Sequence, residues 1–422
     1  MSDFTYRDGQ LYAEDISLSE IAKRYATPCY VYSNKSIQSK YLEFDSAFGS
    51  EKHLICYAVK ANSNTSILSI LAKLGSGFDI VSSGELFRVL KAGGSPDRIV
   101  FSGVGKREDE MNFALEQNIK CFNVESRSEL TTLSKVAKNM KLVAPVSLRV
   151  NPDVDAKTHP YIATGLKENK FGIAFESAKD IFKQAENDNS IKLIGIDCHI
   201  GSQISELSPF QDALRKIFDL IGELGELGII LKHVDIGGGL GISYKDEVPP
   251  TPNEYVNAIT DITRECDLEI IIEPGRSIIG NAGVLLTKVE YLNKTPLKNF
   301  AVVDAAMNDL IRPSLYDSWH EIKRVTEESS EGVKAYDVVG PICETGDFLG
   351  RNRKLSLNEG DLLAIQSAGA YGFSMSSNYN SRPRASEVLV DGTKVHEIRR
   401  SETFEDLING EYLVYTHLVI LF

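Results

Sequence analysis

Short apolar segments alternate with amphipathic segments along more than half of this chain, and this alternation constrains the fold more than any other feature. The segments typical of strands begin near His53, Phe78, Ile99, Cys121, Val146, Leu193, His233 and Glu269. Between them, apolar residues recur three and four positions apart, as in helices that cover a sheet. Several strand segments are apolar throughout, which is typical of parallel strands covered on both faces. Eight such units predict a (β/α)₈ barrel, with an open doubly wound sheet as the alternative.

The pattern changes after about residue 280, where helical periodicity gives way to short β-rich segments separated by turn residues. These segments begin at Val284, Phe300, Ala335, Leu362 and Glu387. Such spacing is typical of an antiparallel β-domain. We therefore predict an α/β plus β chain, with a barrel over residues 30–282 and a mostly antiparallel β-domain over 283–422. Segments 10–13 and 29–32 are candidates to add strands from the beginning of the chain to that β-domain.

The acidic composition limits the partners of this chain. It has 422 residues, with 46 Lys and Arg against 59 Asp and Glu, and a formal net charge of −13. Neutralising a nucleic acid or an anionic membrane takes clustered basic residues, so we expect neither as a partner. A small anionic ligand is compatible with this charge, because a local site can still be basic.

We expect a cytoplasmic protein with free thiols. The first residues lack the regions of a signal peptide, and no apolar stretch approaches the ~18 residues of a membrane span. The six cysteines are far apart and form no C-x-x-C pair. This favours reduced thiols over disulfides or a zinc site, and we expect no metal. Five of the six cysteines, all except Cys343, are expected to be buried as small apolar residues.

Polar side chains follow the ends of the predicted strands, where parallel barrels place their active sites. These residues are Lys60, Ser82, Ser102, Glu125, Arg149, Asn151, His199, the glycine run 237–239, Glu273 and Arg276. A polar group at each strand end predicts a single site at one mouth of the barrel.

Two of these positions suggest covalent chemistry and anion binding. Lys60 ends an apolar strand, where desolvation should lower the pKa of its amine and suit it to Schiff-base formation; the alternative is a lysine that extends to solvent. The glycines at 237–239 can bring backbone N–H groups close to a phosphate. The alternative is a tight turn after a strand. A dinucleotide fingerprint is disfavoured, because Ile242 replaces its third glycine.

Two further positions suggest contacts with an aromatic, charged ligand. Glu273 can pair with a protonated ring nitrogen, and Arg276 can grip a carboxylate bidentately. The alternative is a structural ion pair between them. His199 is flat and amphipathic and can stack on a ring; the alternative is a packed histidine of the core.

Taken together, these features compose a pyridoxal phosphate site, and the motifs resemble those of the alanine-racemase-fold enzymes. The shared motifs are Tyr57-Ala-Val-Lys-Ala-Asn, His199-Ile-Gly-Ser-Gln, Gly237-Gly-Gly-Leu-Gly and Glu273-Pro-Gly-Arg-Ser. Further motifs resemble the diaminopimelate decarboxylase family and cover almost the whole chain in order. They are Thr158-His-Pro-Tyr-Ile-Ala-Thr-Gly, Lys170-Phe-Gly, Arg312-Pro-Ser-Leu-Tyr, Cys343-Glu-Thr-Gly-Asp and Gly369-Ala-Tyr-Gly. A small departure is Thr345, where the family more often has Ser.

The resemblance implies how the cofactor would be held. Lys60 would bind pyridoxal 5'-phosphate covalently, His199 would stack on its ring, and Glu273 would hydrogen-bond the ring nitrogen. A carboxylate there keeps the ring protonated and makes it a strong electron sink. The residues that would surround the phosphate or ring are Ser202, Gly238, Gly239, Gly275, Arg276 and Tyr371.

The resemblance also implies the reaction, which converts meso-2,6-diaminopimelate to L-lysine and carbon dioxide in the last step of lysine biosynthesis. Arg276 and Arg312 would bind the distal carboxylate of the substrate, and Glu344 its ammonium group. Tyr316 and Tyr371 would also contact the substrate. Cys343 would be the proton donor. In this family Cys343 and Glu344 belong to the neighbouring subunit, which implies a homodimer with shared active sites.

Other functions compatible with the fold are kept as alternatives. The nearest are decarboxylases of ornithine, arginine or carboxynorspermidine, although Arg312 and the segment from Thr158 favour a substrate with a distal carboxylate. Alanine racemase is disfavoured, because it places an arginine where this chain has Glu273. A non-catalytic pyridoxal-phosphate-binding protein should have lost Lys60 or Cys343, and both are present.

Overall fold

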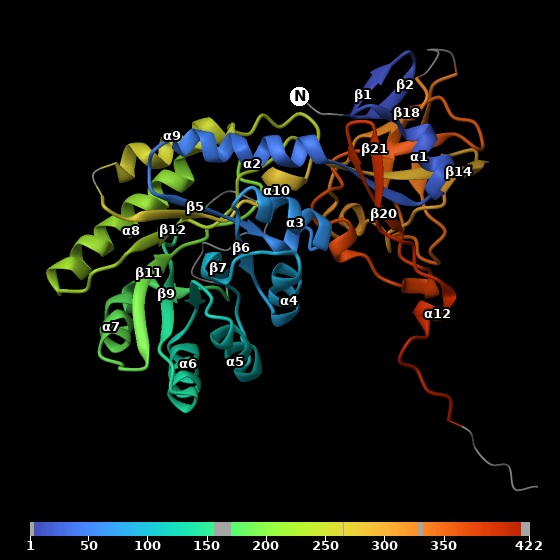
Figure 1. The fold of residues 1–422 in the computed structure, drawn as a ribbon. Coiled ribbons are helices and arrows are strands. Elements are labelled where there is room, and N and C mark those ends of the chain that lie inside the picture. Colours follow the sequence, from blue (N-terminus) through green and yellow to red (C-terminus); the bar gives the residue numbers. More distant parts are fainter. Residues whose placement is uncertain (1–3, 156–169, 265, 328–331, 415–422) are drawn as a thin grey trace, which may run out of the picture.

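Eight parallel strands close into a barrel in this computed structural model, which describes residues 4–155, 170–264, 266–327 and 332–414 (Figure 1). The barrel strands are β5 (His53–Ala58), β6 (Gly77–Ile80), β7 (Ile99–Phe101), β8 (Cys121–Val124), β9 (Ala144–Asn151), β11 (Ile191–Asp197), β12 (His233–Asp235) and β13 (Glu269–Ile272). Each pairs in parallel with its neighbours, β8 with β9 and β13 with β5, so the barrel has no open edge. A two-residue strand, β10 (Ile173–Ala174), pairs with β9. The predicted (β/α)₈ barrel is confirmed.

Helices surround the barrel (Figure 1). They are α2 (Asn34–Phe48), α3 (Thr65–Lys73), α4 (Ser83–Lys91), α5 (Glu108–Glu116), α6 (Arg127–Met140), α7 (Phe175–Glu186), α8 (Ser208–Glu226), α9 (Pro252–Thr263) and the short α10 (Arg276–Ile279). Local sequence sets their starts, as α9 shows. Thr251 Oγ accepts from Glu254 N–H at 3.2 Å, and the Glu254 carboxylate accepts from Thr251 N–H at 2.8 Å. Pro252 then occupies the first turn, where no N–H is needed.

The cysteines lie largely where the apolar pattern places them. Cys29, Cys56, Cys121 and Cys198 are buried free thiols, and Cys56 and Cys121 pack with Leu54, Val100 and Ile271. The expectation for Cys266 is wrong. It is exposed, because it lies in the connection between α9 and β13 rather than within either element. Among the helices that the structure describes, none is both long and apolar enough to cross a membrane.

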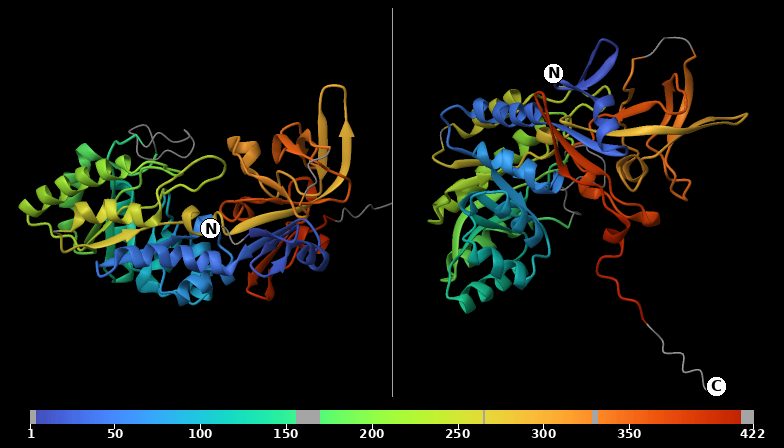
Figure 2. Two further views of the ribbon diagram at one scale, coloured as in Figure 1. Left: turned by 90° about the horizontal axis from the view of Figure 1, so that it is seen from above. Right: turned by 45° about the vertical axis from the view of Figure 1, so that its right-hand side comes forward.

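A second sheet forms a β-domain beside the barrel, and the two lobes are distinct in every view (Figure 2). Its strands are β4 (Cys29–Ser33), β14 (Gly283–Lys294), β15 (Asn299–Val303), β16 (Ile322–Arg324), β17 (Lys334–Val339), β18 (Gly350–Leu355), β19 (Leu362–Ile365), β20 (Ser386–Asp391) and β21 (Lys394–Arg399). Most pairings are antiparallel, but β4 with β20 and β15 with β17 are parallel. Two short helices, α11 (Arg312–Tyr316) and α12 (Phe404–Leu407), complete this part of the chain.

The beginning of the chain joins this β-domain in two ways. Strand β4 lies in the middle of the sheet between β14 and β20, as proposed for segment 29–32. Segment 10–13 forms a strand too, but in a separate sheet of β1 (Phe4–Arg7), β2 (Gln10–Ala13) and β3 (Ile16–Ser17), followed by α1 (Leu18–Tyr25). Leu11 N–H donates to the Val325 carbonyl at 2.7 Å and attaches this small sheet to the β-domain. The predicted limits 30–282 and 283–422 stay a prediction.

Residues 61–64, directly after β5, fasten the barrel to the β-domain. The Ala61 carbonyl accepts from Tyr371 N–H at 2.8 Å, and Asn62 Nδ2 donates to the Gly369 carbonyl at 3.3 Å. Asn64, the N-cap of α3, donates to Glu387 Oε2 at 2.9 Å. We call residues 61–64 with their β-domain partners the seam.

Glu387 is the charged centre of the seam. Its side chain is buried and accepts hydrogen bonds from Tyr32 at 2.8 Å, Asn64 at 2.9 Å and Arg399 at 2.7 Å. A buried carboxylate with three donors is stable only while all of them remain in place.

We expect Glu387→Ala to lower the free energy of unfolding by about 3 kcal/mol, because it leaves buried donors of Tyr32 and Asn64 without an acceptor. Urea unfolding of the purified protein measures this change. Glu397→Ala, on the exposed part of β21, is the matched control and should change stability little. Equal stability of the two variants would contradict the role of Glu387.

Candidate active site

A cavity of about 200 Å³ opens where the carboxyl ends of the barrel strands meet the β-domain. Its lining residues are Ala58, Lys60, His199, Ser202, Gly238, Gly239, Leu240, Glu273, Gly275, Arg276, Arg312, Tyr316, Tyr371 and Met375. Every residue that the resemblance assigns to the cofactor is in this set, and so are Arg312 and Tyr316. Cys343 and Glu344 are not.

Lys60 lies in a single 3₁₀ turn, η1 (Val59–Ala61), directly after β5, and its amine reaches the neighbouring strand β6. There Lys60 Nζ donates to the fully buried carboxylate of Asp79. Burial disfavours the ammonium ion, but the carboxylates of Asp79 and Glu273 outweigh it and raise the pKa of Lys60 above its ordinary value. The prediction of a lowered pKa is therefore wrong for Lys60, because desolvation is not its only influence.

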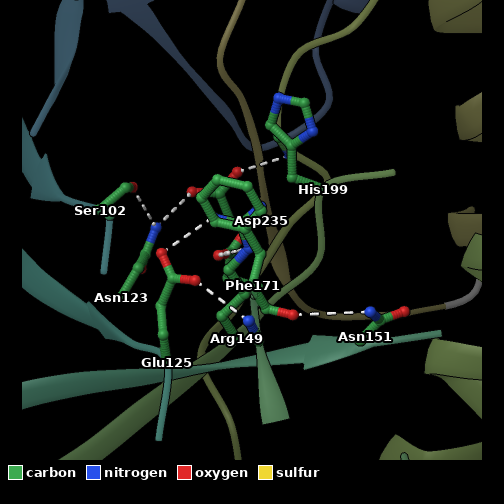
Figure 3. Close-up of polar contacts among 12 residues, drawn as sticks. Ser102, Asn123, Glu125, Arg149, Asn151, Phe171, His199 and Asp235 are labelled. Atoms are coloured by element: carbon green, nitrogen blue, oxygen red, sulfur yellow. Dashed lines mark hydrogen bonds and ion pairs between the residues drawn. The ribbon is translucent and has the colours of Figure 1, made fainter. Parts of the chain in front are cut away.

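Glu273 follows β13 and joins a network inside the barrel mouth. Figure 3 shows three other members of this network, Ser102, Asn123 and Asp235. Glu273 Oε1 accepts from Ser102 Oγ at 3.3 Å and from Asn123 Nδ2 at 3.5 Å. Asn123 Nδ2 also lies 3.3 Å from Asp235 Oδ2 and 3.1 Å from Ser102 Oγ. Burial and the nearby carboxylates of Asp235 and Asp79 raise the pKa of Glu273 well above its ordinary value. Burial also raises the pKa of Asp235, to about 6.

A second part of the network is centred on Arg149 in β9 (Figure 3). Arg149 Nη1 donates to Glu125 Oε1 at 3.0 Å, and Arg149 Nε lies 3.8 Å from Asp197 Oδ2. Its guanidinium carbon is 5.1 Å from the ring centre of Phe171, whose carbonyl accepts from Asn151 Nδ2 at 3.5 Å. Arg149 thus balances part of the buried negative charge next to Glu273.

His199 and the glycine run lie on adjoining strand ends. Burial, with the nearby positive charges of Arg149 and Lys60, lowers the pKa of His199 well below its ordinary value, so its imidazole is neutral. A Cβ at Gly238 would lie 2.3 Å from the Glu273 carbonyl oxygen. A Cβ at Gly239, where φ is +113°, would lie 2.6 Å from the Gly201 carbonyl oxygen. Only glycine brings the backbone this close at these two positions.

Arg276 begins α10 and is held at both terminal nitrogens. Nη1 donates to Tyr244 Oη at 2.6 Å, and Nη2 donates to Ser202 Oγ at 2.9 Å. Its guanidinium carbon is 4.9 Å from the ring centre of Tyr371. Burial opposes the charge of Arg276, but the hydrogen bond and proximity of Tyr244 keep its pKa above the ordinary value.

Arg312 comes from α11 of the β-domain and lies near the same aromatic side chains. Its guanidinium carbon is 5.4 Å from the ring centres of Tyr244 and Tyr316 and 6.0 Å from that of Tyr371. Burial and the positive charge of Arg276 lower the pKa of Arg312 from its ordinary value. Two buried guanidinium groups thus lie at one cavity without an ion pair to any carboxylate of the described chain.

Some expected site residues lie elsewhere. Cys343 and Glu344 are exposed on a turn of the β-domain, where Cys343 N–H donates to Asn380 Oδ1 at 3.0 Å and Glu344 accepts from Tyr379 Oη. Ser82 is the N-cap of α4, a structural role. The motif that begins at Thr158 lies outside the described residues.

The sequence interpretation missed four polar residues of this site: Asp79, Asn123, Asp235 and Tyr244. The first three lie within strands β6, β8 and β12 rather than after them, where a polar residue in an apolar run is the signal that could have found them. Tyr244 lies seven residues after Gly237 in a loop, and no local pattern marks it.

Comparisons with known proteins agree with this geometry. Residues 34–280 match the family model described as "Pyridoxal-dependent decarboxylase, pyridoxal binding domain". The diaminopimelate decarboxylase of Pseudomonas aeruginosa is 56% identical over 98% of this chain and 100% of its own length. That of Vibrio cholerae is 56% identical over 96% of this chain and 98% of its own length.

Solved structures show the same similarity. The diaminopimelate decarboxylase of Helicobacter pylori, complexed with L-lysine, has a TM-score of 0.89 at 45% identity and covers 93% of this chain and 98% of its own. That of M. jannaschii, also in complex with L-lysine, has a TM-score of 0.93 at 38% identity and covers 97% of this chain and 98% of its own.

We expect Asp79→Asn to lower the pKa of Lys60 by about 1–3 pH units, because burial of the amine remains while the carboxylate that favours its charge is removed. The pH dependence of acylation at Lys60, followed by mass spectrometry on protein freed of bound aldehyde, measures this change. Asp97→Asn, an exposed aspartate before β7, is the control. If the pKa of Lys60 is unchanged or raised in Asp79→Asn, Asp79 is not the cause of the raised pKa of Lys60.

Proposed function

The chain belongs to the diaminopimelate decarboxylase family of pyridoxal-dependent enzymes, and from this we propose that it releases carbon dioxide from the D-centre of meso-diaminopimelate to give L-lysine, the last step of lysine biosynthesis. The observation that carries the proposal is the pair of buried arginines, Arg276 and Arg312, at the cavity that holds Lys60 and Glu273. Buried cations are stable only with an anionic partner. A substrate with a carboxylate at its far end supplies one.

The residues present fit pyridoxal phosphate. The backbone at Gly238 and Gly239 leaves room for no side chain, as expected of a surface that approaches a phosphate. Arg276, which lines the cavity, has a buried Nε without a hydrogen-bond partner in the described chain, so the cavity keeps an unused polar group. When bound, this group supplies an electron-withdrawing ring that accepts the electron pair left as carbon dioxide departs.

The positions of the side chains support the cofactor roles that we propose. Lys60 would bind the aldehyde carbon, His199 would offer a neutral ring for stacking, and Glu273 would hold a proton at the ring nitrogen. The residues around the phosphate and ring would be Ser202, Gly238, Gly239, Gly275, Arg276 and Tyr371. The positive charge of the protonated ring nitrogen would favour the carboxylate form of Glu273. It would thereby offset the rise in the pKa of Glu273 that burial produces.

The arginine pair supports the mode of substrate binding that we propose. The L-centre of meso-diaminopimelate keeps its carboxylate through the reaction, so both substrate and L-lysine can pair with Arg276 and Arg312. Tyr316 and Tyr371 would contact the carbon chain beside them. Ornithine and arginine have no carboxylate at their far ends and would leave the two guanidinium groups unpaired, which disfavours them.

The function is tested by carbon dioxide release from meso-diaminopimelate, ornithine and arginine in the presence of pyridoxal phosphate. We expect release from meso-diaminopimelate alone. Arg312→Met should lower kcat/KM for it by about 100-fold, because the charge-assisted hydrogen bonds to the distal carboxylate are lost.

Arg215→Met is the matched control, since Arg215 is exposed on the outside of α8 and its ion pair with Asp212 is local. Release from ornithine or arginine instead of meso-diaminopimelate would assign the chain to a related decarboxylase. No release from any of the three, with pyridoxal phosphate bound, would favour a non-catalytic binding protein.

Completion of the site requires a proton donor, and we propose that a second copy of the chain provides it. After carbon dioxide leaves, the substrate carbon must receive a proton. Cys343 and Glu344 lie outside the cavity and are exposed. In a two-fold dimer, Cys343 of one subunit would protonate that carbon in the site of the other, and Glu344 would bind the distal ammonium. The four buried free thiols fit a cytoplasmic enzyme, which we include in the proposal.

Mixing two inactive variants, Lys60→Ala and Cys343→Ala, tests the shared site. In a two-fold dimer each mixed pair keeps one intact site, so remixing should restore about a quarter of the wild-type activity. Carbon dioxide release from meso-diaminopimelate, after the subunits are dissociated and reassociated together, measures it. Each variant remixed with itself is the control. If the mixture is no more active than these controls, the shared site is contradicted. Cys343 and Lys60 would then act within the same chain, or Cys343 would not be the proton donor.

A further inference from the structure

We propose that Tyr244 is a positioning residue that orients Arg276 and Arg312 together, and that it thereby sets the preference for ligands with a distal carboxylate. The inference rests on the proposed function and deepens it. Tyr244 is buried and does not line the main cavity. It lines an adjoining cavity of about 140 Å³, which shares Arg312 and Tyr316 with the main one. Tyr244 therefore acts on a ligand through the arginines.

Tyr244 contacts the two arginines in different ways. Its hydroxyl accepts from Arg276 Nη1 at 2.6 Å, and its ring centre lies 5.4 Å from the guanidinium carbon of Arg312. The hydroxyl fixes one guanidinium by a directed bond, and the ring attracts the other through its negative face. Ser202 holds Nη2 of Arg276, so the plane of that guanidinium is fixed only while both Tyr244 and Ser202 are bonded.

Contacts with the Tyr244 ring also offset part of the repulsion between the two arginines. Burial and the positive charge of Arg276 both lower the pKa of Arg312. An aromatic ring in contact with both offers each of them an attractive partner that carries no charge. His320 packs edge-on against Tyr244, with ring centres 5.1 Å apart, and burial lowers its pKa to about 3. His320 is therefore neutral and adds no third positive charge.

The loop that carries Tyr244 is fixed on its other side. Glu247 Oε2 accepts from the backbone N–H of Tyr244 at 3.0 Å and of Lys245 at 2.7 Å. The Ser243 carbonyl accepts from Asn281 Nδ2 at 3.1 Å. Behind the ring, His320 Nδ1 lies 2.9 Å from the Gln366 carbonyl oxygen. Because both the backbone and the ring of Tyr244 are fixed, Tyr244 can define the orientation of the two guanidinium groups.

The test compares ligands with and without the carboxylate. L-Lysine and 1,5-diaminopentane are measured as inhibitors of meso-diaminopimelate decarboxylation by the holoenzyme, in the wild type and in Tyr244→Phe. The phenylalanine keeps the ring beside Arg312 but removes the acceptor of Arg276. We expect the inhibition constant of L-lysine to rise about tenfold and that of 1,5-diaminopentane to stay nearly constant. KM for meso-diaminopimelate should rise more than kcat falls.

Two further variants keep the result interpretable. Tyr244→Leu removes the ring as well and should weaken L-lysine binding more than Tyr244→Phe does, because Arg312 then loses its aromatic contact. Tyr336→Phe, a buried tyrosine of β17 outside both cavities, is the matched control. The pyridoxal phosphate content of every variant is measured alongside.

The possible results separate this inference from the proposed function. If the wild type binds 1,5-diaminopentane as tightly as L-lysine, the proposed role of the arginines fails. If the wild type prefers L-lysine and Tyr244→Phe keeps the full preference, the role of Tyr244 fails. An equal loss of affinity for both ligands would indicate a general structural effect and would also overturn it.

Discussion

Pairing of the first barrel strand with the last, β5 with β13, is the constraint on which the site depends. Ile55 stands opposite Ile272, and Ala58 N–H donates to the Pro274 carbonyl at 3.2 Å. In an open sheet, these two strands would lie at opposite edges, and Lys60 would be far from Glu273. Closure instead makes their ends neighbours. Gly275 fits there because a Cβ would meet Ala58 Cβ at 3.0 Å.

The charges around the cavity fall into two groups that do not neutralise each other. The carboxylates of Asp79 and Glu273 lie with Lys60 at the barrel mouth, whereas Arg276 and Arg312 lie among tyrosines. Within the described chain, no ion pair joins either arginine to a carboxylate. Such a separation costs free energy in the absence of a ligand, because buried charges are stabilised chiefly by direct partners. A ligand with several charged groups recovers that free energy on binding, which is how a polar metabolite is selected.

The architecture and most of the cavity could be predicted from sequence, because strand periodicity and strand-end polarity are local properties. The pKa of Lys60 could not, since its direction depends on Asp79, which is buried inside the neighbouring strand β6. Asn123 and Asp235 were missed for the same reason: polar residues within short apolar strands look like interruptions until the barrel brings them together. The role of Tyr244 could not be predicted either, because it rests on contacts with two arginines that are distant in the sequence. The pattern of residues around Tyr244 does not indicate these contacts.

The β-domain also determines the geometry of the barrel site, because it bonds to the backbone beside Lys60. Tyr371, whose φ is +56°, donates its N–H to the Ala61 carbonyl at 2.8 Å, and its ring lies 4.9 Å from the Arg276 guanidinium. A left-handed backbone at a bulky residue persists only when its surroundings hold it there. The seam provides that support, because the N–H of Tyr371 is bonded to the residue next to Lys60. The contacts that join the barrel to the β-domain therefore also position the side chains of the site.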